Sequence, residues 1–373
     1  MTSTKVNKNF LFFFVHSSKF HVFRLTINYL IQNGHSVDIL ITSKDVLEEL
    51  VKEEGWDYNN IFPEGRKIKN LPIFVSAGIN TIRTIYRLFK YTKGKKYDLF
   101  ITDDLLVFLT KILKVPSFAF TDDDISVTKQ FSIILSRATH ILAPEITDLE
   151  KYNNKKISFN GYKELAYLHP NNFVPNEKVI KKINPTLEKY FLIRLVSLKA
   201  YHDVFMKGLS NEQVQKIIKL LETKGRVYIS AERDLPEQFQ KYQLKIEPEK
   251  IAHVLYYADL FIGDSQTMTS EAAVLGTPAF RCNDFAGKIS VMDEKEEKYG
   301  LSYNYSPKGF NKMYAKLEEV ISKENFKKEF QQKKENMLSD KIDLTKFMIW
   351  LFEYYPNSIS EYQNNPDIQY RFR

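Results

Sequence analysis

The chain alternates short apolar runs with segments of helical periodicity. Residues 11–15 are continuously apolar, and a helical pattern follows over residues 22–32. Apolar runs that lack polar alternation and end at turn residues are typical of parallel strands buried on both faces. The pattern therefore predicts an open α/β sheet in the first half of the chain, with strands at residues 11–15, 36–42, 99–102, 117–121 and 140–143.

The second half repeats this organisation after an interruption. Periodicity lapses over residues 162–185, which contain three prolines and two adjacent asparagines, a composition typical of a linker. Strand-like and helix-like segments then alternate up to residue 281. Residues 310–339 form a mixed-charge helical pattern, and residues 344–355 an apolar, aromatic one. We expect an N-terminal Rossmann-like domain (1–168), a C-terminal Rossmann-like domain (186–343), and a C-terminal helix and tail (344–373).

Composition narrows the class of protein. The 373 residues are 43% hydrophobic and 27% charged, as in ordinary globular domains. A single cysteine, Cys282, rules out an intrachain disulfide and a cysteine-built zinc cluster. Residues 10–15 are too short an apolar stretch to span a membrane, which takes roughly 20 residues, and residues 1–8 lack the layout of a signal peptide. We therefore expect a cytoplasmic protein.

The positive charge is concentrated in one segment. The chain has 54 Lys and Arg against 46 Asp and Glu, a formal charge of +8. Residues 61–98 hold nine basic residues and two acids, a local balance of +7. Apolar residues recur there at helical spacing beside a basic stripe; the apolar set is Ile79, Ile82, Ile85, Tyr86 and Phe89, and the basic set is Arg83, Arg87 and Lys90.

Two interpretations of this basic segment stay open. Its cationic face is either merely solvated, or it contacts an anionic membrane peripherally between Arg66 and Lys96. Nucleic acid is not expected as a partner, because no RNA- or DNA-binding motif accompanies the patch.

Residues 258–281 carry the most informative pattern. A strand ends at Gly263, a polar turn follows, and a helix begins near Gln266. The backbone N–H groups and dipole of a helix N-terminus favour a phosphate, and the hydroxyls of Ser265 and Thr267 add donors. Glu271 lies one helical turn after Thr267 and can accept hydrogen bonds from sugar or ribose hydroxyls. This segment therefore predicts a phosphate and sugar site.

A plainer interpretation of the same segment is that Asp264 and Ser265 cap the helix and Glu271 is a solvated surface residue. The chain contains neither a G-x-G-x-x-G loop nor a G-x-x-x-x-G-K-[ST] loop. This absence argues against a dinucleotide dehydrogenase and a P-loop NTPase.

Acidic residues follow two strands of the first half. Asp103 and Asp104 come after residues 99–102, and Asp122 begins a run of three aspartates after residues 117–121. Carboxyl ends of parallel strands are where ligands bind in open α/β sheets. Carboxylates there can orient a sugar, act as a base or hold a divalent cation; the alternative is that they cap loops and are solvated.

Two histidines flank the loop that leaves the first strand. Neutral imidazole is available at physiological pH, so His16 or His21 can act as a general base on an acceptor hydroxyl. His21 is preferred because it starts the first helix. The alternative is a histidine that only caps or packs.

Six segments carry a resemblance to a known family, in that family's order. They read HVFRLTINYLIQNGHSVDILITSKD (21–45), ITDD (101–104), RLVSLKAYHDVFMKGLS (194–210), GRVYISAERDLPEQF (225–239), GDSQTMTSEAAVLGTPAFR (263–281) and FMIWLFEYYP (347–356). The chain resembles the prokaryotic family called domain of unknown function 354, which is similar to glycosyltransferases and to non-hydrolysing UDP-N-acetylglucosamine 2-epimerases.

The resemblance implies a GT-B fold in which the second domain holds a nucleotide sugar and the acceptor or reacting sugar faces the first domain. It implies that phosphate is contacted by Ser265, Gln266 and Thr267, and the ribose by Glu271. Further phosphate and sugar contacts are expected from Arg194, His202 and Lys207. Glu232 and Arg233 either bind the base edge or pair with each other. The nucleotide sugar is then a substrate, and neither a cofactor nor a metal is expected.

The expected function is a GT-B glycosyltransferase of polysaccharide biosynthesis, which moves a sugar from a nucleoside-diphosphate sugar to a cell-surface glycan or lipid-linked acceptor. The base would be His21, Asp103, Asp104 or Asp122. One alternative is a nucleotide-sugar epimerase, although residues 199–203 read KAYHD where the epimerases have an HRxEN-like run. The other alternative is a nucleotide-sugar-binding protein without catalysis.

Overall fold

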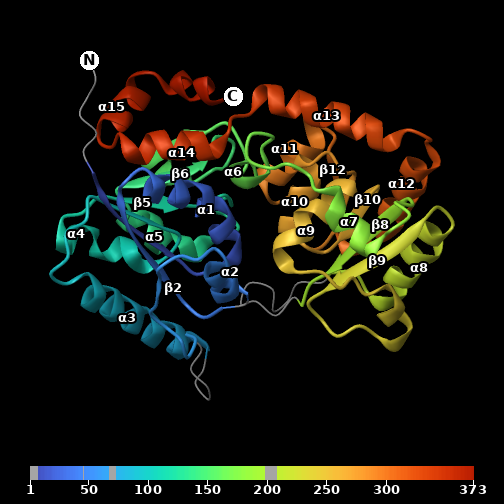
Figure 1. Ribbon diagram of the computed structural model, residues 1–373, viewed down its shortest axis with the longest axis horizontal. Helices are drawn as coiled ribbons and strands as arrows, with labels where there is room; N and C mark the ends of the chain where they lie inside the picture. Colours follow the sequence, from blue (N-terminus) through green and yellow to red (C-terminus); the bar gives the residue numbers. More distant parts are fainter. Residues whose placement is uncertain (1–6, 45, 67–72, 198–207) are drawn as a thin grey trace. The chain divides into compact units, whose positions relative to one another are not determined.

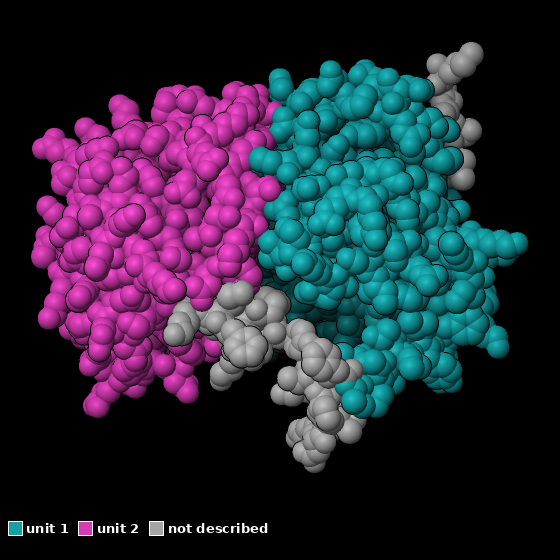
Figure 2. All heavy atoms as spheres, turned by 180° about the vertical axis from the view of Figure 1, so that it is seen from behind, with its two compact units in different colours: residues 1–167, 342–373 teal, residues 168–341 magenta. Residues whose placement is uncertain are grey.

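The computed structural model describes residues 7–44, 46–66, 73–197 and 208–373. The chain forms two compact units (Figure 2). Unit 1 comprises residues 1–167 and 342–373, and unit 2 comprises residues 168–341. Each unit is built on a parallel sheet with helices, so the predicted α/β class is confirmed.

In the described residues, unit 1 contains a seven-stranded sheet of order β3-β2-β1-β4-β5-β6-β7, with every neighbouring pair parallel (Figure 1). Its strands are β1 (Asn9–Phe14), β2 (Ser36–Ile41), β3 (Asn59–Asn60), β4 (Leu99–Thr102), β5 (Ser117–Phe120), β6 (His140–Pro144) and β7 (Lys156–Phe159). Its helices are α1 (Ser17–Gln32), α2 (Leu47–Glu53), α3 (Ile73–Thr92), α4 (Thr110–Leu113), α5 (Ser132–Arg137), α14 (Leu344–Glu353) and α15 (Asn357–Asn364), with 3₁₀ helices η1 (Leu105–Leu109), η2 (Lys129–Phe131), η3 (Glu150–Lys155) and η8 (Pro366–Phe372).

Unit 2 contains, in its described part, a five-stranded parallel sheet of order β12-β11-β10-β8-β9. Its strands are β8 (Tyr190–Leu195), β9 (Arg226–Ala231), β10 (Leu260–Gly263), β11 (Ala279–Cys282) and β12 (Ser302–Tyr305). Its helices are α7 (Glu177–Ile183), α8 (Asn211–Glu222), α9 (Ile251–Tyr257), α10 (Gln266–Val274), α11 (Ser290–Glu297), α12 (Phe310–Ser322) and α13 (Phe326–Asp340), with η5 (Glu237–Tyr242), η6 (Pro248–Lys250) and η7 (Pro307–Gly309).

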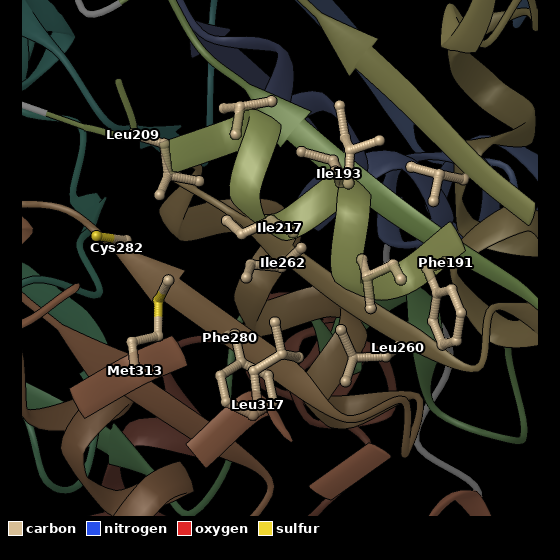
Figure 3. Packing of buried hydrophobic residues seen from close by; sticks show 14 of the residues in the cluster. Phe191, Ile193, Leu209, Ile217, Leu260, Ile262, Phe280, Cys282, Met313 and Leu317 are labelled. Atoms are coloured by element: carbon tan, nitrogen blue, oxygen red, sulfur yellow. The ribbon is translucent and has the colours of Figure 1, made fainter. Parts of the chain in front are cut away.

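Aromatic and aliphatic side chains fill both cores. In unit 1, Phe10 to Phe14 of β1 are fully buried, as expected for a strand covered on both faces. In unit 2, side chains from β8, β10, β11 and the helix α12 converge on one cluster, which includes Ile193, Ile262, Phe280 and Leu317 (Figure 3). Both sheets are therefore buried layers.

The C-terminal segment packs on the first sheet. Helix α14 lies beside α1 (Figure 1), and its Phe352 ring contacts Phe12 of β1 and Phe118 of β5, at centroid distances of 6.3 and 5.2 Å. Residues 344–373, set apart in the sequence analysis, thus complete the core of unit 1. The expected linker, residues 162–185, contains the helices α6 (Leu165–Leu168) and α7.

Replacing Phe352 by alanine should destabilise unit 1 by about 3 to 5 kcal/mol, because it removes a fully buried ring between two other rings. Both tryptophans, Trp56 and Trp350, lie in unit 1, so urea unfolding followed by tryptophan fluorescence reports this unit. The matched control is Tyr354→Ala, at a side chain that is 52% exposed. Equal stability of the two variants would contradict a core role for α14.

Candidate functional site

The candidate site of unit 1 lies at the carboxyl edge of its sheet. Parallel registration places Thr102, the last residue of β4, opposite Phe13 of β1 and Ala119 of β5. The loops that follow these three strands therefore leave the sheet at the same edge. They carry four of the predicted chemical groups: His16, Asp103, Asp104 and Asp122.

Asp122 is held in a buried ion cluster. Its Oδ1 lies 3.0 Å from Lys19 Nζ of α1, and its Oδ2 lies 2.6 Å from Lys163 Nζ. All three side chains are at most 10% exposed. Burial alone would raise the pKa of Asp122, but the ammonium groups of Lys163 and Lys19 hold it well below its usual range. Asp122 is thus a permanent anion.

Asp103 lies at the same edge of the sheet, but its pKa is shifted in the opposite direction from that of Asp122. The side chain is 2% exposed, and no group of the described chain donates a hydrogen bond to its Oδ1. Burial raises the pKa of Asp103 to about 7, against the opposing attraction of Lys19. This carboxyl group can therefore gain or release a proton near neutral pH.

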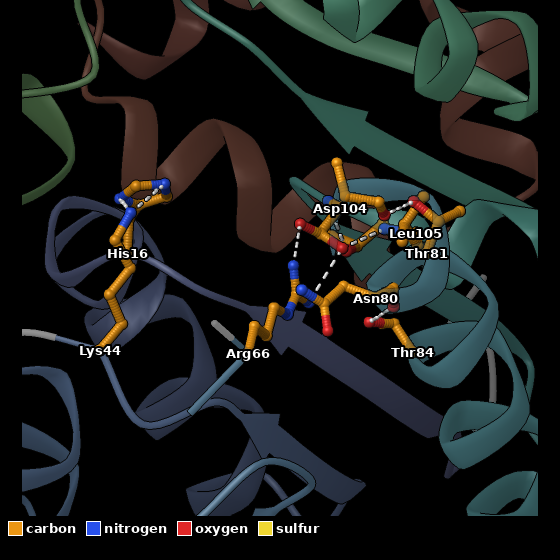
Figure 4. Close-up of polar contacts among 10 residues, drawn as sticks. His16, Lys44, Arg66, Asn80, Thr81, Thr84, Asp104 and Leu105 are labelled. Atoms are coloured by element: carbon orange, nitrogen blue, oxygen red, sulfur yellow. Dashed lines mark hydrogen bonds and ion pairs between the residues drawn. The ribbon is translucent and has the colours of Figure 1, made fainter. Parts of the chain in front are cut away.

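Asp104 is fixed by an arginine. Both of its oxygens accept from the guanidinium of Arg66, at 2.9 and 3.0 Å (Figure 4). Its Oδ1 also accepts from the backbone N–H of Leu105 and so caps η1. The loop-cap interpretation therefore describes Asp104, whose carboxylate is committed to these contacts.

The two histidines make different contacts. His21 lies against the rings of Phe20 and Tyr167, each with a centroid distance of 5.3 Å, and burial lowers its pKa to about 4. It is a packed, neutral and weakly basic imidazole at pH 7. His16 is within 3.0 Å of Lys44 Nζ (Figure 4).

In unit 2, the predicted cationic residue Arg194 lies on β8, next to residues of the neighbouring strands. Registration aligns Gly263 of β10 with Arg194 of β8 on one side and Arg281 of β11 on the other, and Arg194 with Ser230 of β9. A Cβ on Gly263 would lie 2.4 Å from the carbonyl oxygen of Arg194, so this position needs glycine. The close approach lets the chain turn into α10 directly from the sheet.

The N-terminus of α10 has a side-chain cap and backbone N–H groups that could bind a phosphate. Ser265 Oγ accepts from the backbone N–H of Met268, so its hydroxyl caps the helix. Helix geometry aims the first-turn N–H groups, those of Gln266 and Thr267, out of the N-terminus. Glu271 is only 7% exposed. The interpretation of Glu271 as a solvated surface residue is therefore wrong.

Asp264 is a site residue whose importance the sequence did not reveal. Its Oδ1 accepts from the backbone N–H of Val196 at 2.7 Å, and Asn283 donates to its carbonyl oxygen at 3.0 Å. A Cβ on Gly208 would lie 2.4 Å from its Oδ2. Burial raises the pKa of Asp264 to about 6. Instead of capping α10, it ties the ends of β8 and β10 together; its position after a strand was the one available signal.

Arg194 is engaged within the sheet. It donates to Ser230 Oγ at 2.6 Å and pairs with Glu232. Arg233 donates to the carbonyl of Leu209, while Glu232 pairs with Arg194. Of the two interpretations of Glu232 and Arg233, the one in which they pair with each other is therefore wrong. His202 and Lys207, the other predicted contacts, lie outside the described residues.

The comparisons identify the family. A family model described as "Protein of unknown function (DUF354)" matches residues 14–349. The chain belongs to the DUF354 family. No match was found among curated proteins.

Solved structures similar to this DUF354 protein include ones described as a glycotransferase and as a UDP-GlcNAc 2-epimerase. S. aureus MnaA with UDP has a TM-score of 0.65 at 13% identity, covering 95% of this chain and 98% of that chain. The glycotransferase of kitacinnamycin has a TM-score of 0.60 at 12% identity, covering 93% and 99%. UDP-GlcNAc 2-epimerase from Neisseria meningitidis bound to UDP-GlcNAc has 0.61 at 12%, covering 95% and 100%. These likenesses confirm the expected GT-B fold.

The described part of the DUF354 protein lacks two further features. Among the described residues, no group of three or more His, Cys, Asp or Glu side chains is placed to hold a metal ion. Over the same residues, no helix has the length and apolar character needed to cross a membrane.

The pKa of Asp103 makes stability depend on pH. Between pH 4 and 7 the unfolded chain releases this proton, since its pKa is about 3.9, whereas the folded chain retains it. The folded state therefore loses stability as pH rises through this interval. Asp103→Asn has no such proton, so its stability relative to wild type should rise by up to roughly 4 kcal/mol over the interval and stay constant above it.

Urea unfolding followed by tryptophan fluorescence at pH 4.5, 6 and 8 checks this expectation, with the exposed Asp57→Asn as control. A difference between Asp103→Asn and wild type that does not change with pH would contradict the raised pKa.

Proposed function

We propose that this DUF354 protein is a glycosyltransferase that takes a sugar from a nucleoside-diphosphate sugar, with nucleotide binding in unit 2 and acid–base chemistry in unit 1. The observation that carries the proposal is a pair of carboxyl groups with opposite behaviour. Asp103 titrates near neutral pH, whereas Asp122 stays ionised beside Lys19 and Lys163. Titratable groups whose environments separate their pKa values are typical of acid–base sites.

The nucleotide side of the proposal uses the carboxyl edge of unit 2. The N-terminus of α10, with Ser265, Gln266 and Thr267, would bind the diphosphate through backbone N–H groups, and Glu271 would accept from the ribose. The structures with UDP and UDP-GlcNAc bound support a nucleotide sugar as ligand. Arg194, His202 and Lys207 stay predicted contacts, and Arg194 would have to exchange Glu232 for phosphate.

The proposed transfer is a direct displacement. The acceptor hydroxyl oxygen forms a bond to the anomeric carbon while the bond from that carbon to the diphosphate oxygen breaks. Asp103, as carboxylate, takes the hydroxyl proton, because its pKa near 7 matches a general base at neutral pH. The leaving diphosphate gains stabilisation from the helix N-terminus. His21, with its low pKa, is the weaker base.

The proposed acceptor is a cell-surface glycan or a lipid-linked acceptor, and the proposed location is the cytoplasm. A second candidate function is epimerisation of the nucleotide sugar itself. The same Asp103 favours it, since a carboxyl group with a pKa near 7 also suits removal of a carbon-bound proton. The two functions differ in whether an acceptor is needed.

Glu271→Gln should weaken nucleotide binding at least tenfold, because it replaces a buried acceptor of ribose hydroxyls by an amide. Calorimetry with UDP, GDP, ADP, TDP and CMP measures this, with the exposed Glu297→Gln as control. Circular dichroism checks that the variant is folded. If no nucleotide binds to the wild type at millimolar concentration, the nucleotide-sugar proposal is wrong.

Asp103→Asn should lower kcat by about 10² to 10⁴, with a small change in KM, because it removes the base and leaves the binding groups intact. Turnover is measured with the nucleotide sugar that binds, with and without candidate acceptors. Conversion of the sugar without an acceptor would select the epimerase. Binding with no turnover, and with Asp103→Asn identical to wild type, would indicate a protein without catalysis.

A further inference from the structure

Helix α3 presents its apolar residues to solvent. The exposed stripe, as we call it here, follows helical spacing along one face and is formed by Val75, Ile79, Ile82, Tyr86 and Phe89. Ile82 is 71% and Tyr86 is 65% exposed. A stripe from residue 75 to 89 extends about 21 Å along the helix. Contiguous exposed apolar residues of this kind mark interaction surfaces.

The opposite face of α3 packs on unit 1 and mixes apolar with polar side chains, since Ile85 and Leu88 pack in its core. Ser76, Thr84, Leu88 and Thr92 are buried there. The hydroxyls of Thr84 and Thr92 donate to carbonyls one turn back in the helix, at 2.6 and 2.9 Å, so they are satisfied without other partners. The helix therefore buries part of its apolar side chains and several internally bonded hydroxyls against the core, while the five residues of the exposed stripe stay in contact with solvent.

Positive charge flanks the exposed stripe. Helix α3 contains no acidic residue. Arg83 and Arg87 share one acid, Glu64, at 2.9 and 2.6 Å, and Arg87 lies 4.2 Å above the Phe62 ring. Lys90 and Lys93 at the C-terminal end are exposed. One carboxylate between two guanidiniums leaves this surface cationic.

We propose that the exposed stripe of α3 docks on an anionic lipid bilayer. Apolar residues on one face with cations beside them are what an interfacial helix needs, because acyl chains take the apolar side chains and anionic headgroups take the cations. Tyr86 suits the headgroup level, since its ring is apolar and its hydroxyl polar. A second copy of the chain fits poorly, because a two-fold contact would bring together the cationic residues beside two such stripes.

This inference goes beyond the proposed function and does not rest on it, since vesicle binding needs neither a nucleotide nor turnover. Seven of the nine basic residues of segment 61–98 belong to the described chain, and Lys67 and Lys69 lie outside it.

The test is flotation of the full chain with phosphatidylcholine vesicles and with vesicles of phosphatidylcholine and phosphatidylglycerol at 3:1. We expect at least tenfold tighter binding to the anionic vesicles, weakened by 0.5 M NaCl. Ile82→Asn with Tyr86→Asn should reduce binding at least tenfold. The matched control is Ile112→Asn with Val174→Asn, at side chains that are 60% and 79% exposed.

A second variant, Lys90→Gln with Lys93→Gln, tests the contribution of charge. It should weaken binding to the anionic vesicles about fivefold for each lysine. Its matched control is Lys216→Gln with Lys219→Gln, an exposed pair at the same spacing on α8.

Three results would overturn the proposal: no binding to anionic vesicles, binding that the Ile82 and Tyr86 variant leaves unchanged, or a concentration-dependent dimer that this variant abolishes in sedimentation.

Discussion

The ion cluster of Asp122 with Lys19 and Lys163 is the interaction on which the first site depends. It joins the loop after β5 to the first turn of α1 and to the segment before α6. Removing one member of a buried ion pair costs about 3 to 5 kcal/mol, because the remaining charge is left uncompensated. The cluster also acts on Asp103, whose raised pKa is opposed by the charge of Lys19. Structure and proton chemistry at this edge are therefore coupled.

At the carboxyl edge of the sheet in unit 2, close backbone contacts among the described residues take the place of an ion cluster. Gly263 brings β10 against Arg194, and Asp264 binds Val196 at the end of β8. These contacts fix where α10 begins, and so where its N-terminal N–H groups are aimed. Unit 1 thus carries buried charge at the carboxyl edge of its sheet, and unit 2 carries oriented backbone donors at the carboxyl edge of its own.

Sequence patterns predicted the buried strands well and the partners of buried charges not at all. Strand β4 has the predicted bounds and β10 ends at Gly263 as predicted, because short apolar runs that end at polar residues leave little choice. β7 and β12 were missed, because they lie at sheet edges and contain polar residues. Lys19 is 103 residues from Asp122 in the sequence. A lysine in an amphipathic helix is usually expected to be solvated, so this pair could not be predicted. Helical spacing likewise grouped four of the five residues of the exposed stripe of α3, but it added Ile85, which packs against the core. The same period fits a face turned inward or outward.

Hydrogen exchange of the full chain, read by mass spectrometry with and without each nucleoside diphosphate, tests the central claim most directly. The account predicts that one nucleotide protects backbone amides at the start of α10, around Gln266 and Thr267, through direct contact with phosphate. Protection confined to peptides from unit 1, or no protection by any of the nucleotides, would contradict a nucleotide site at the carboxyl edge of unit 2.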